Sequence, residues 1–155
     1  MNATPFPPHA QNAEHAQHAR ERFLAFRKRL YVEHDLTAVD EYLHPSFASE
    51  NPMVGGSGIA AYKTFIARFY TGVPDLRPVE QHVLVEGDEL MAMTTWSATH
   101  TGTFLGATPT HKVLRFATAD RYALRDGLLY RHWDVVDRLQ ASIDMGLLRQ
   151  ASAPF

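Results

Sequence analysis

The spacing of apolar residues in the first half of the chain predicts helices. Between residues 13 and 30, apolar side chains recur every three or four positions, which places them on one buried stripe of a helix. They are Ala19, Phe23, Phe26 and Leu30, and Arg20, Arg22, Arg27 and Lys28 are expected on the other faces. A short second helix is predicted over residues 37–43. A third begins at Ser57 or Gly58 and ends before Pro74.

The periodicity changes after Pro78, where apolar and polar residues alternate as they do in strands. This alternation predicts four strands, over residues 79–86, 89–101, 112–124 and 128–136. Gly87-Asp88 and Asp126-Gly127 lie between successive strands and favour tight hairpins. Most neighbouring strands should therefore pair antiparallel.

Two weaker segments complete the fold prediction. Residues 47–54 suggest a short strand and a loop, and residues 139–149 a last helix with Asp137 as its N-cap. Helices that precede a meandering sheet indicate an α+β fold. We expect a strongly curved, mixed or antiparallel sheet that wraps around the N-terminal helices as a cone, and the interior of such a cone is where small-molecule sites are usually built.

Composition fits one globular domain. The chain has 155 residues, of which 45% are apolar and 21% charged, and this is enough for one sizeable core. Residues 1–12 contain prolines in a polar setting and are expected to form a tail. We expect a single domain over residues 13–150 and a short C-terminal tail over residues 151–155.

Charge and cysteine content narrow the expected partners. The 15 basic and 17 acidic residues form no basic stripe, so nucleic-acid binding is not expected. No signal-peptide pattern and no stretch typical of a membrane span is present, which makes the cytoplasm the default location. The chain has no cysteine, and His15 and His18 have no third ligand nearby in sequence. Neither a metal nor another cofactor is expected.

The last predicted hairpin places polar side chains inside otherwise apolar strands. If Arg125-Asp126-Gly127 forms a three-residue loop, six of these side chains share one face of the sheet. The expected pairs are Asp120–His132, Tyr122–Tyr130 and Thr118–Asp134. A two-residue loop would shift the register by one residue and break these pairings.

This arrangement suggests acid–base chemistry. A carboxylate in an apolar cavity has a raised pKa and can accept and return a proton near neutral pH, so Asp134 is the candidate base for proton abstraction next to a carbonyl. Asp120 and His132 are candidates to orient the substrate or share charge. The candidates for substrate binding are Asn51, His100, Phe116, Thr118, Tyr122 and Tyr130, among which Thr118 and the two tyrosines can donate hydrogen bonds to a developing enolate. The competing interpretation is that Asp134 only pairs with Arg115 or Arg121.

Several sequence segments, in this order, resemble the SnoaL-like polyketide cyclases. They are ENPMVGG at 50–56, AYKTF at 61–65, VPDL at 73–76, VEGDEL at 85–90, THTGTFLGATPTHK at 99–112 and RDGLLYRHWDVVD at 125–137. The resemblance covers about residues 20–150. It implies the nuclear-transport-factor-2-like cone fold and a cofactor-free intramolecular aldol condensation of an aromatic polyketide ester.

The same resemblance implies residue roles. Asp134 matches the aspartate that acts as acid and base in those cyclases, and Asn51 matches an early polar contact. Asp120 stands where they have a histidine, which is a departure from the family. An acid beside an acid would raise one of the two pKa values further.

Three functions remain open at this level. The first is a cofactor-independent cyclase or isomerase that acts on a hydrophobic carbonyl compound. The second is a non-catalytic module that binds a small molecule in the same pocket. The third, epoxide hydrolysis, needs an Asp-Arg-Asp constellation, which Asp120, Arg121 and Asp134 match only loosely because Arg121 should face away. A homodimer is expected through an apolar surface of the sheet, with Met91, Met93, Trp96 or Leu114 in the contact.

Overall fold

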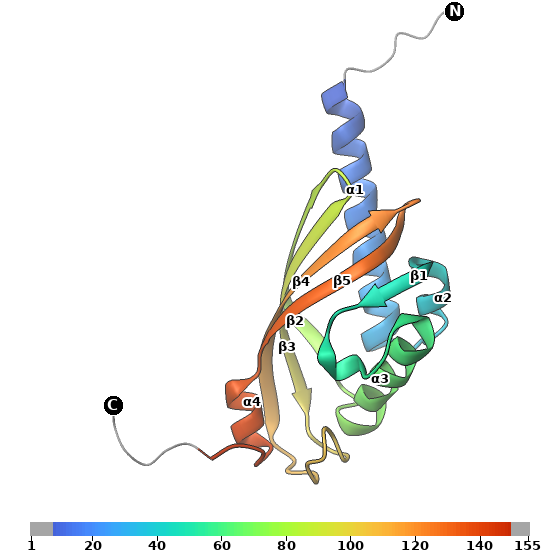
Figure 1. Cartoon of the computed structure of the whole chain (residues 1–155). Coiled ribbons are helices and arrows are strands. Elements are labelled where there is room, and N and C mark those ends of the chain that lie inside the picture. Colours follow the sequence, from blue (N-terminus) through green and yellow to red (C-terminus); the bar gives the residue numbers. More distant parts are fainter. Residues whose placement is uncertain (1–7, 150–155) are drawn as a thin grey trace, which may run out of the picture.

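The computed structural model describes residues 8–149, and their helices precede most of the sheet (Figure 1). The helical elements are α1 (Pro8–Arg27), the π-helical η1 (Lys28–Val32), α2 (Ala38–Tyr42), the 3-10 helix η2 (Pro52–Val54), α3 (Gly58–Gly72) and α4 (Leu139–Asp144). The strands are β1 (Leu43–Ser49), β2 (Arg77–Glu86), β3 (Glu89–Thr99), β4 (Val113–Arg125) and β5 (Leu128–Asp137). The α+β fold class is confirmed.

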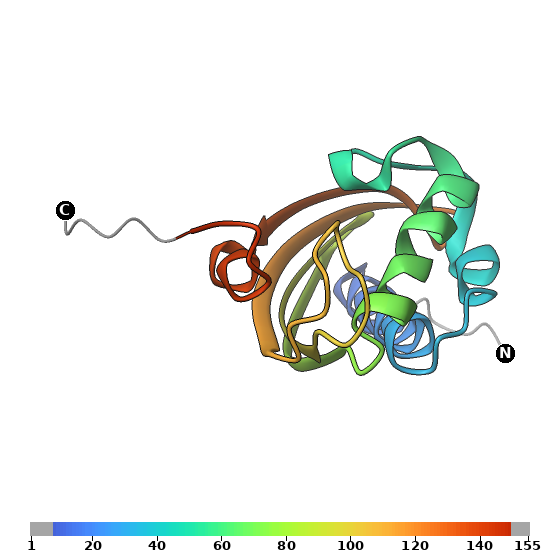
Figure 2. The same cartoon turned by 90° about the horizontal axis from the view of Figure 1, so that it is seen from below.

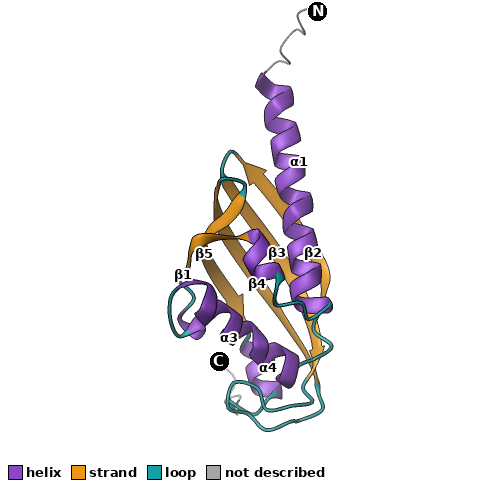
Figure 3. Ribbon diagram, turned by 90° about the vertical axis from the view of Figure 1, so that its right-hand side faces the viewer, coloured by secondary structure: helices purple, strands orange, loops and turns teal. Residues whose placement is uncertain are grey.

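The five strands form one mixed sheet in the order β1-β5-β4-β3-β2. Strand β1 runs parallel to β5, and the other neighbours pair antiparallel, as the two hairpin signals predict. Figure 2 shows that the sheet curves around the helices, and Figure 3 shows α1 running along the sheet beside β2 and β3. The concave face of the sheet is therefore turned toward α1 and α3.

The chain ends differ from the sequence prediction. Helix α1 begins at Pro8, so residues 8–12 are helical instead of part of a tail, while residues 1–7 and 150–155 lie outside the described residues. The expected cap at Asp137 is wrong, because this residue still pairs with Ala117 as the last residue of β5. Arg138 takes the N-cap position, and α4 ends at Asp144. None of the described helices has the length and apolar character needed to cross a bilayer.

The register of the last hairpin corrects the predicted pairs. Arg125 pairs with Leu128, so the loop has two residues, Asp126 and Gly127, and both adopt positive φ angles of 53° and 71°. This is the conformation that a tight turn between twisted strands requires. A bulge then follows, because Leu129 pairs with Leu124 while Arg131 pairs with Ala123.

The turn and the bulge together shift the pairing by two residues. The observed pairs are Asp120–Asp134, Tyr122–His132 and Thr118–Val136, in place of the three predicted ones. Since side chains alternate with a period of two, Asp120, His132 and Asp134 still share one face. Tyr130 is the extra residue of the bulge, and it leaves this regular alternation.

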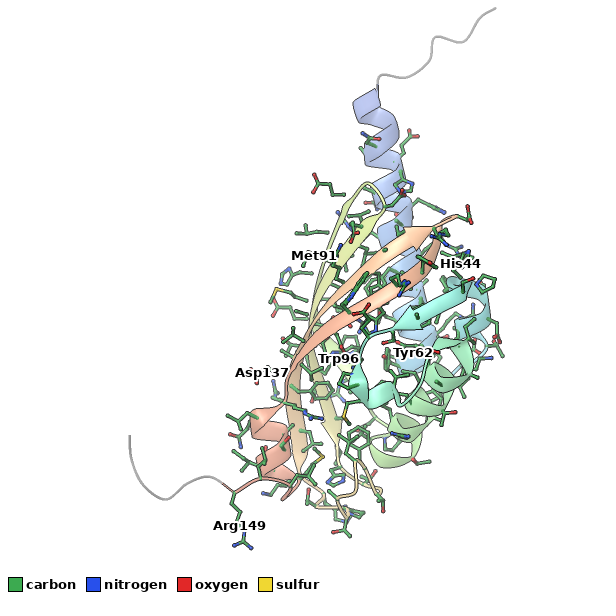
Figure 4. All side chains as sticks on the ribbon, viewed as in Figure 1. His44, Tyr62, Met91, Trp96, Asp137 and Arg149 are labelled. Atoms are coloured by element: carbon green, nitrogen blue, oxygen red, sulfur yellow. The ribbon has the colours of Figure 1, made fainter. Side chains whose placement is uncertain are left out.

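The outer face of the sheet carries exposed apolar side chains. Met91 is 55% and Met93 64% exposed, and Met93 stands in register with Ala119 and then Val135, which is 73% exposed. Figure 4 shows Met91 on the side of the sheet away from α3. The expected dimer contacts at Trp96 and Leu114 are wrong, because both side chains are buried on the inner face.

A homodimer through the outer face stays a prediction. The double substitution Met91→Glu with Met93→Glu should convert a dimer into a monomer, because two charges would have to be buried in the contact. Light scattering after size exclusion measures the mass in solution. Thr64→Glu, on the exposed side of α3, should leave the mass unchanged. A wild-type protein that is monomeric at micromolar concentration contradicts the prediction.

Candidate active site

A pocket of about 860 Å³, including solvent space at its mouth, lies between the concave face of the sheet and the helices. Much of its wall is aromatic or aliphatic, and its apolar lining includes Phe65, Phe69, Trp96, Phe104, Leu114 and Phe116. The polar side chains that line it include Arg27, Asn51, Thr118, Asp120, His132 and Asp134. Figure 4 labels two of the lining residues, Tyr62 on α3 and Trp96 on β3.

A buried ion pair joins helix α1 to the centre of the sheet. Nη2 of Arg27 lies 2.6 Å from Oδ2 of Asp120, and both side chains are at least nine-tenths buried. Burial alone would raise the pKa of Asp120. The Arg27 charge and hydrogen bonds from His132 and Thr118 outweigh this effect and hold the pKa well below its ordinary value of 3.8. Asp120 is therefore ionised at neutral pH.

His132 is fixed by hydrogen bonds at both ring nitrogens. Nε2 lies 3.0 Å from Oδ1 of Asp120, and Nδ1 lies 2.9 Å from Oγ of Ser49. Because the Asp120 carboxylate can only accept, Nε2 carries the hydrogen in this contact. The imidazole also stacks on the ring of Tyr122, with centroids 4.5 Å apart. Ser49 does not line the pocket, so this Ser-His-Asp chain presents no nucleophile to a ligand there.

Asp134 occupies a different environment, although it lies directly opposite Asp120 in the sheet. It is partly buried and lines the pocket, and its Oδ2 accepts a hydrogen bond of 2.6 Å from Nδ2 of Asn51. The side-chain oxygen Oδ1 of Asn51 in turn accepts a hydrogen bond of 2.7 Å from the backbone N–H of Met53, which fixes the orientation of the side-chain amide. The loop before α3 therefore positions the Asp134 carboxylate.

The pKa of Asp134 is raised above its ordinary value of 3.8. Removal from water is the main cause, and the negative charge of Asp120 adds to it. His132, the Asn51 amide and the Arg27 charge act in the opposite direction without cancelling the rise. The expectation that one of two neighbouring acids has a raised pKa is met, and the acid in question is Asp134.

The arginines that the sequence offered as structural partners of Asp134 lie elsewhere. Arg121 points to the outer face, where its guanidinium binds Glu89 at 2.7 and 2.9 Å. Arg115 is exposed and lies six residues before Arg121 in β4. Because side chains alternate along a strand, it faces outward as Arg121 does. The interpretation of Asp134 as the partner of either arginine is wrong.

The predicted substrate-binding residues divide into two groups. Asn51, Thr118 and Phe116 line the pocket. The Thr118 hydroxyl donates to Asp120 at 2.7 Å and accepts from the indole of Trp96 at 3.1 Å, so its one hydrogen is already used.

The second group, Tyr122, Tyr130 and His100, does not line the pocket. Tyr122 is buried and its ring stacks against His132. Tyr130 contacts His44 and Arg125 near the hairpin turn, and His100 is buried with its Nδ1 near the Thr110 hydroxyl. These three residues therefore do not reach a ligand in the pocket.

Four lining residues that carry a charge or a phenol hydroxyl were not predicted from the sequence: Arg27, Tyr31, Tyr62 and Arg138. Arg27 was expected on a polar face of its helix, although it follows Phe23 by four positions and so shares the buried stripe. Tyr31 and Tyr62 occupy apolar stripes of η1 and α3, and such tyrosines look like core residues in a sequence. Burial is the main reason that the pKa values of both phenols lie well above 10.0, so the hydroxyls remain protonated.

Asp120, His132 and Asp134 also place potential metal-ligand atoms within 4.8 Å of one another. The donor chemistry does not suit a cation, however. Both oxygens of Asp120 and both ring nitrogens of His132 already have hydrogen-bond partners, and the Arg27 guanidinium supplies a positive charge at the same place. These three side chains therefore do not fit a bound cation.

Comparison with known proteins gives one family and many similar structures. The family described as SnoaL-like polyketide cyclase matches residues 21–145. TsrD from Streptomyces laurentii is 32% identical over 85% of this chain and 95% of that chain, with a TM-score of 0.73. Comparison with curated proteins gives no match.

Two further structures share the fold at lower identity. AclR from Streptomyces galilaeus, provisionally named a hydroxylase, is 21% identical over 88% of this chain and 89% of that chain, with a TM-score of 0.76. A protein from Acidithiobacillus ferrooxidans, provisionally named a polyketide cyclase, is 24% identical over 85% of this chain and 96% of that chain, with a TM-score of 0.73.

The buried ion pair predicts a large effect on stability. Asp120→Asn leaves the Arg27 charge buried without its partner and should lower the free energy of unfolding by about 3–5 kcal/mol. Urea denaturation at neutral pH measures this. The loss should shrink as the pH falls from 3.8 toward the lower pKa of folded Asp120, because in this range the unfolded wild-type chain binds a proton at this carboxyl and the folded chain does not.

Asp137→Asn is the matched control, because Asp137 is exposed at the end of β5. This change should alter the free energy of unfolding by less than about 0.5 kcal/mol. If both variants unfold at the same urea concentration as the wild type, the ion pair does not stabilise the fold as described.

Proposed function

The chain belongs to the SnoaL-like polyketide cyclase family and has its nuclear-transport-factor-2-like fold, and from this premise we propose that it is a cofactor-independent enzyme with Asp134 as its base. Its reaction starts with removal of a proton next to a carbonyl group of a hydrophobic compound. The observation that carries the proposal is a partly buried carboxylate with a raised pKa at the polar end of an otherwise apolar pocket.

The hydrogen bond from Asn51 leaves part of the carboxylate available. Oδ2 of Asp134 is held by the amide, whereas Oδ1 accepts no hydrogen bond from a described residue. In the proposed step, a C–H proton moves to Asp134 and the electron pair of that bond becomes an enolate. The enolate carbon then attacks a second carbonyl of the same molecule, and the new alkoxide takes the proton back from Asp134. An isomerase would instead return the proton to a different carbon.

The enolate needs hydrogen-bond donors, and Tyr31 and Tyr62 are the phenols that line the pocket. Their raised pKa values keep them protonated as donors. We assign them the role that the sequence analysis gave to Tyr122 and Tyr130, which do not line the pocket.

Asp120 and His132 have positioning roles in this proposal. Asp120 stays ionised and binds Arg27, and His132 uses both nitrogens within the protein, so neither is well placed to exchange a proton with a ligand. Their effect on chemistry passes through Asp134, because the charges of Asp120, His132 and Arg27 all influence its pKa.

The two alternatives have weaker support. A pure binding module does not need a carboxylate with a raised pKa in its pocket. Epoxide hydrolysis needs an acid that can protonate the epoxide oxygen, whereas Asp120 is kept ionised by Arg27, and Arg121 binds Glu89 on the outer face. Cyclase or isomerase activity therefore agrees best with the residues of the site.

The direct test replaces the base. Methyl para-acetylbenzoate is an aryl methyl ketone, and uptake of deuterium at its acetyl group in D2O, followed by proton NMR, reports C–H abstraction. Asp134→Asn should lower the catalysed exchange rate by at least about 100-fold. The folded structure should persist, which circular dichroism checks. Asp137→Asn, which removes the same charge outside the pocket, is the control and should exchange at the wild-type rate. Undiminished exchange in Asp134→Asn contradicts the proposal.

The pH dependence provides a second test. The base must be ionised, so kcat/KM for exchange should rise with pH, with a midpoint above 3.8. Removing the amide that favours the charged form, by Asn51→Ala, should move the midpoint to higher pH. A midpoint at or below 3.8 in the wild type, or no shift in the variant, would show that Asp134 is not the titrating base.

A further inference from the structure

One side of the pocket presents an anionic and a cationic side chain, Asp134 and Arg138, four residues apart in the chain. Asp134, Val136 and Arg138 all line the pocket: Asp134 and Val136 are two residues apart in β5, and Arg138 follows the strand directly as the N-cap of α4. At about 3.3 Å per residue, the backbone positions of Asp134 and Arg138 are roughly 13 Å apart. An apolar side chain, Val136, lies between the proposed base and the arginine.

Arg138 lacks a strong partner. Its Nη1 lies 3.6 Å from Sδ of Met53, and a thioether is a weak acceptor. Among residues 8–149, no carboxylate forms an ion pair with Arg138, in contrast to Arg27, which is bound to Asp120. The exposed Arg138 side chain therefore reaches from the start of α4 toward Met53, and its guanidinium donors are available to a ligand.

We propose that the pocket takes aromatic carboxylates, with the carboxylate bound by Arg138 at the mouth and the acidic C–H directed to Asp134. The placement of the acidic C–H of the ligand at Asp134 rests on the proposed function above. Recognition of the ligand's carboxylate by Arg138 does not require turnover. The aromatic part of the ligand would lie against the wall that includes Phe116, Trp96 and Val136.

The charges favour a carboxylate over a phosphate. The Arg27–Asp120 pair is neutral as a unit, so the pocket side chains leave one cation, Arg138, and one anion, Asp134. A monoanion neutralises Arg138, and a carboxylate matches the two parallel N–H groups of a guanidinium. A dianionic phosphate would leave an uncompensated negative charge in the same pocket as Asp134.

The test compares para-acetylbenzoate with its methyl ester, which differ in the anionic group. Dissociation constants are measured by calorimetry at neutral pH for the wild type. The carboxylate should bind about tenfold more tightly than the ester. Arg138→Gln should remove this preference by weakening the carboxylate alone, while Arg138→Lys should keep part of it because a point charge remains.

Arg115→Gln is the matched control, since it removes an exposed arginine from the outer face of β4. It should leave both dissociation constants unchanged. Equal affinities for the two probes in the wild type, or a preference that survives Arg138→Gln, would overturn the inference. No measurable binding of the carboxylate would do the same.

The variant Asp134→Asn separates this inference from the proposed function. It should abolish deuterium exchange but retain the preference for the carboxylate, because Arg138 is intact. If exchange persists in Asp134→Asn while Arg138→Gln still removes the preference, the base assignment fails and the anion site stands.

Discussion

The candidate site depends on one buried ion pair. Arg27 reaches from α1 to Asp120 in β4, and a charge on either residue would be very unfavourable in this interior without the other. By keeping Asp120 ionised, the pair provides an acceptor for His132 and a negative charge near Asp134. Asp120 and Asp134, which are paired on adjacent strands, thus have opposite pKa shifts. The pKa of Asp120 is held low by Arg27, and the pKa of Asp134 is raised mainly by burial.

The turn and the bulge of the last hairpin determine which side chains meet at this place. The two-residue turn alone would have put Asp120 and Asp134 on opposite faces of the sheet, and the extra residue at Tyr130 restores the common face. The bulge is consequently part of how the site is built. The loop at Asn51 then completes it, because β1 runs beside β5 and delivers the amide to Asp134.

The sequence was informative where a pattern is local. Helix and strand periods and the two hairpin turns predicted the α+β fold and most elements, and strand alternation brought Asp120, His132 and Asp134 together. Partners distant in the chain were not predictable, because Arg27 and Asp120 are 93 residues apart and nothing in either segment indicates the other. The bulge was equally hidden, since its register is set by pairing across strands and not by turn residues alone. The pocket residues Tyr31 and Tyr62 looked like core because both lie on apolar stripes of helical segments, and the sequence does not distinguish a pocket wall from a core there.

The central claim is that these two neighbouring aspartates titrate separately. Carbon NMR of the side-chain carboxyl groups, with Asp120→Asn and Asp134→Asn spectra to assign the signals, measures both midpoints in the folded protein. We expect a midpoint below 3.8 for Asp120 and above 3.8 for Asp134. The reverse order, or two midpoints at the ordinary value, would contradict it.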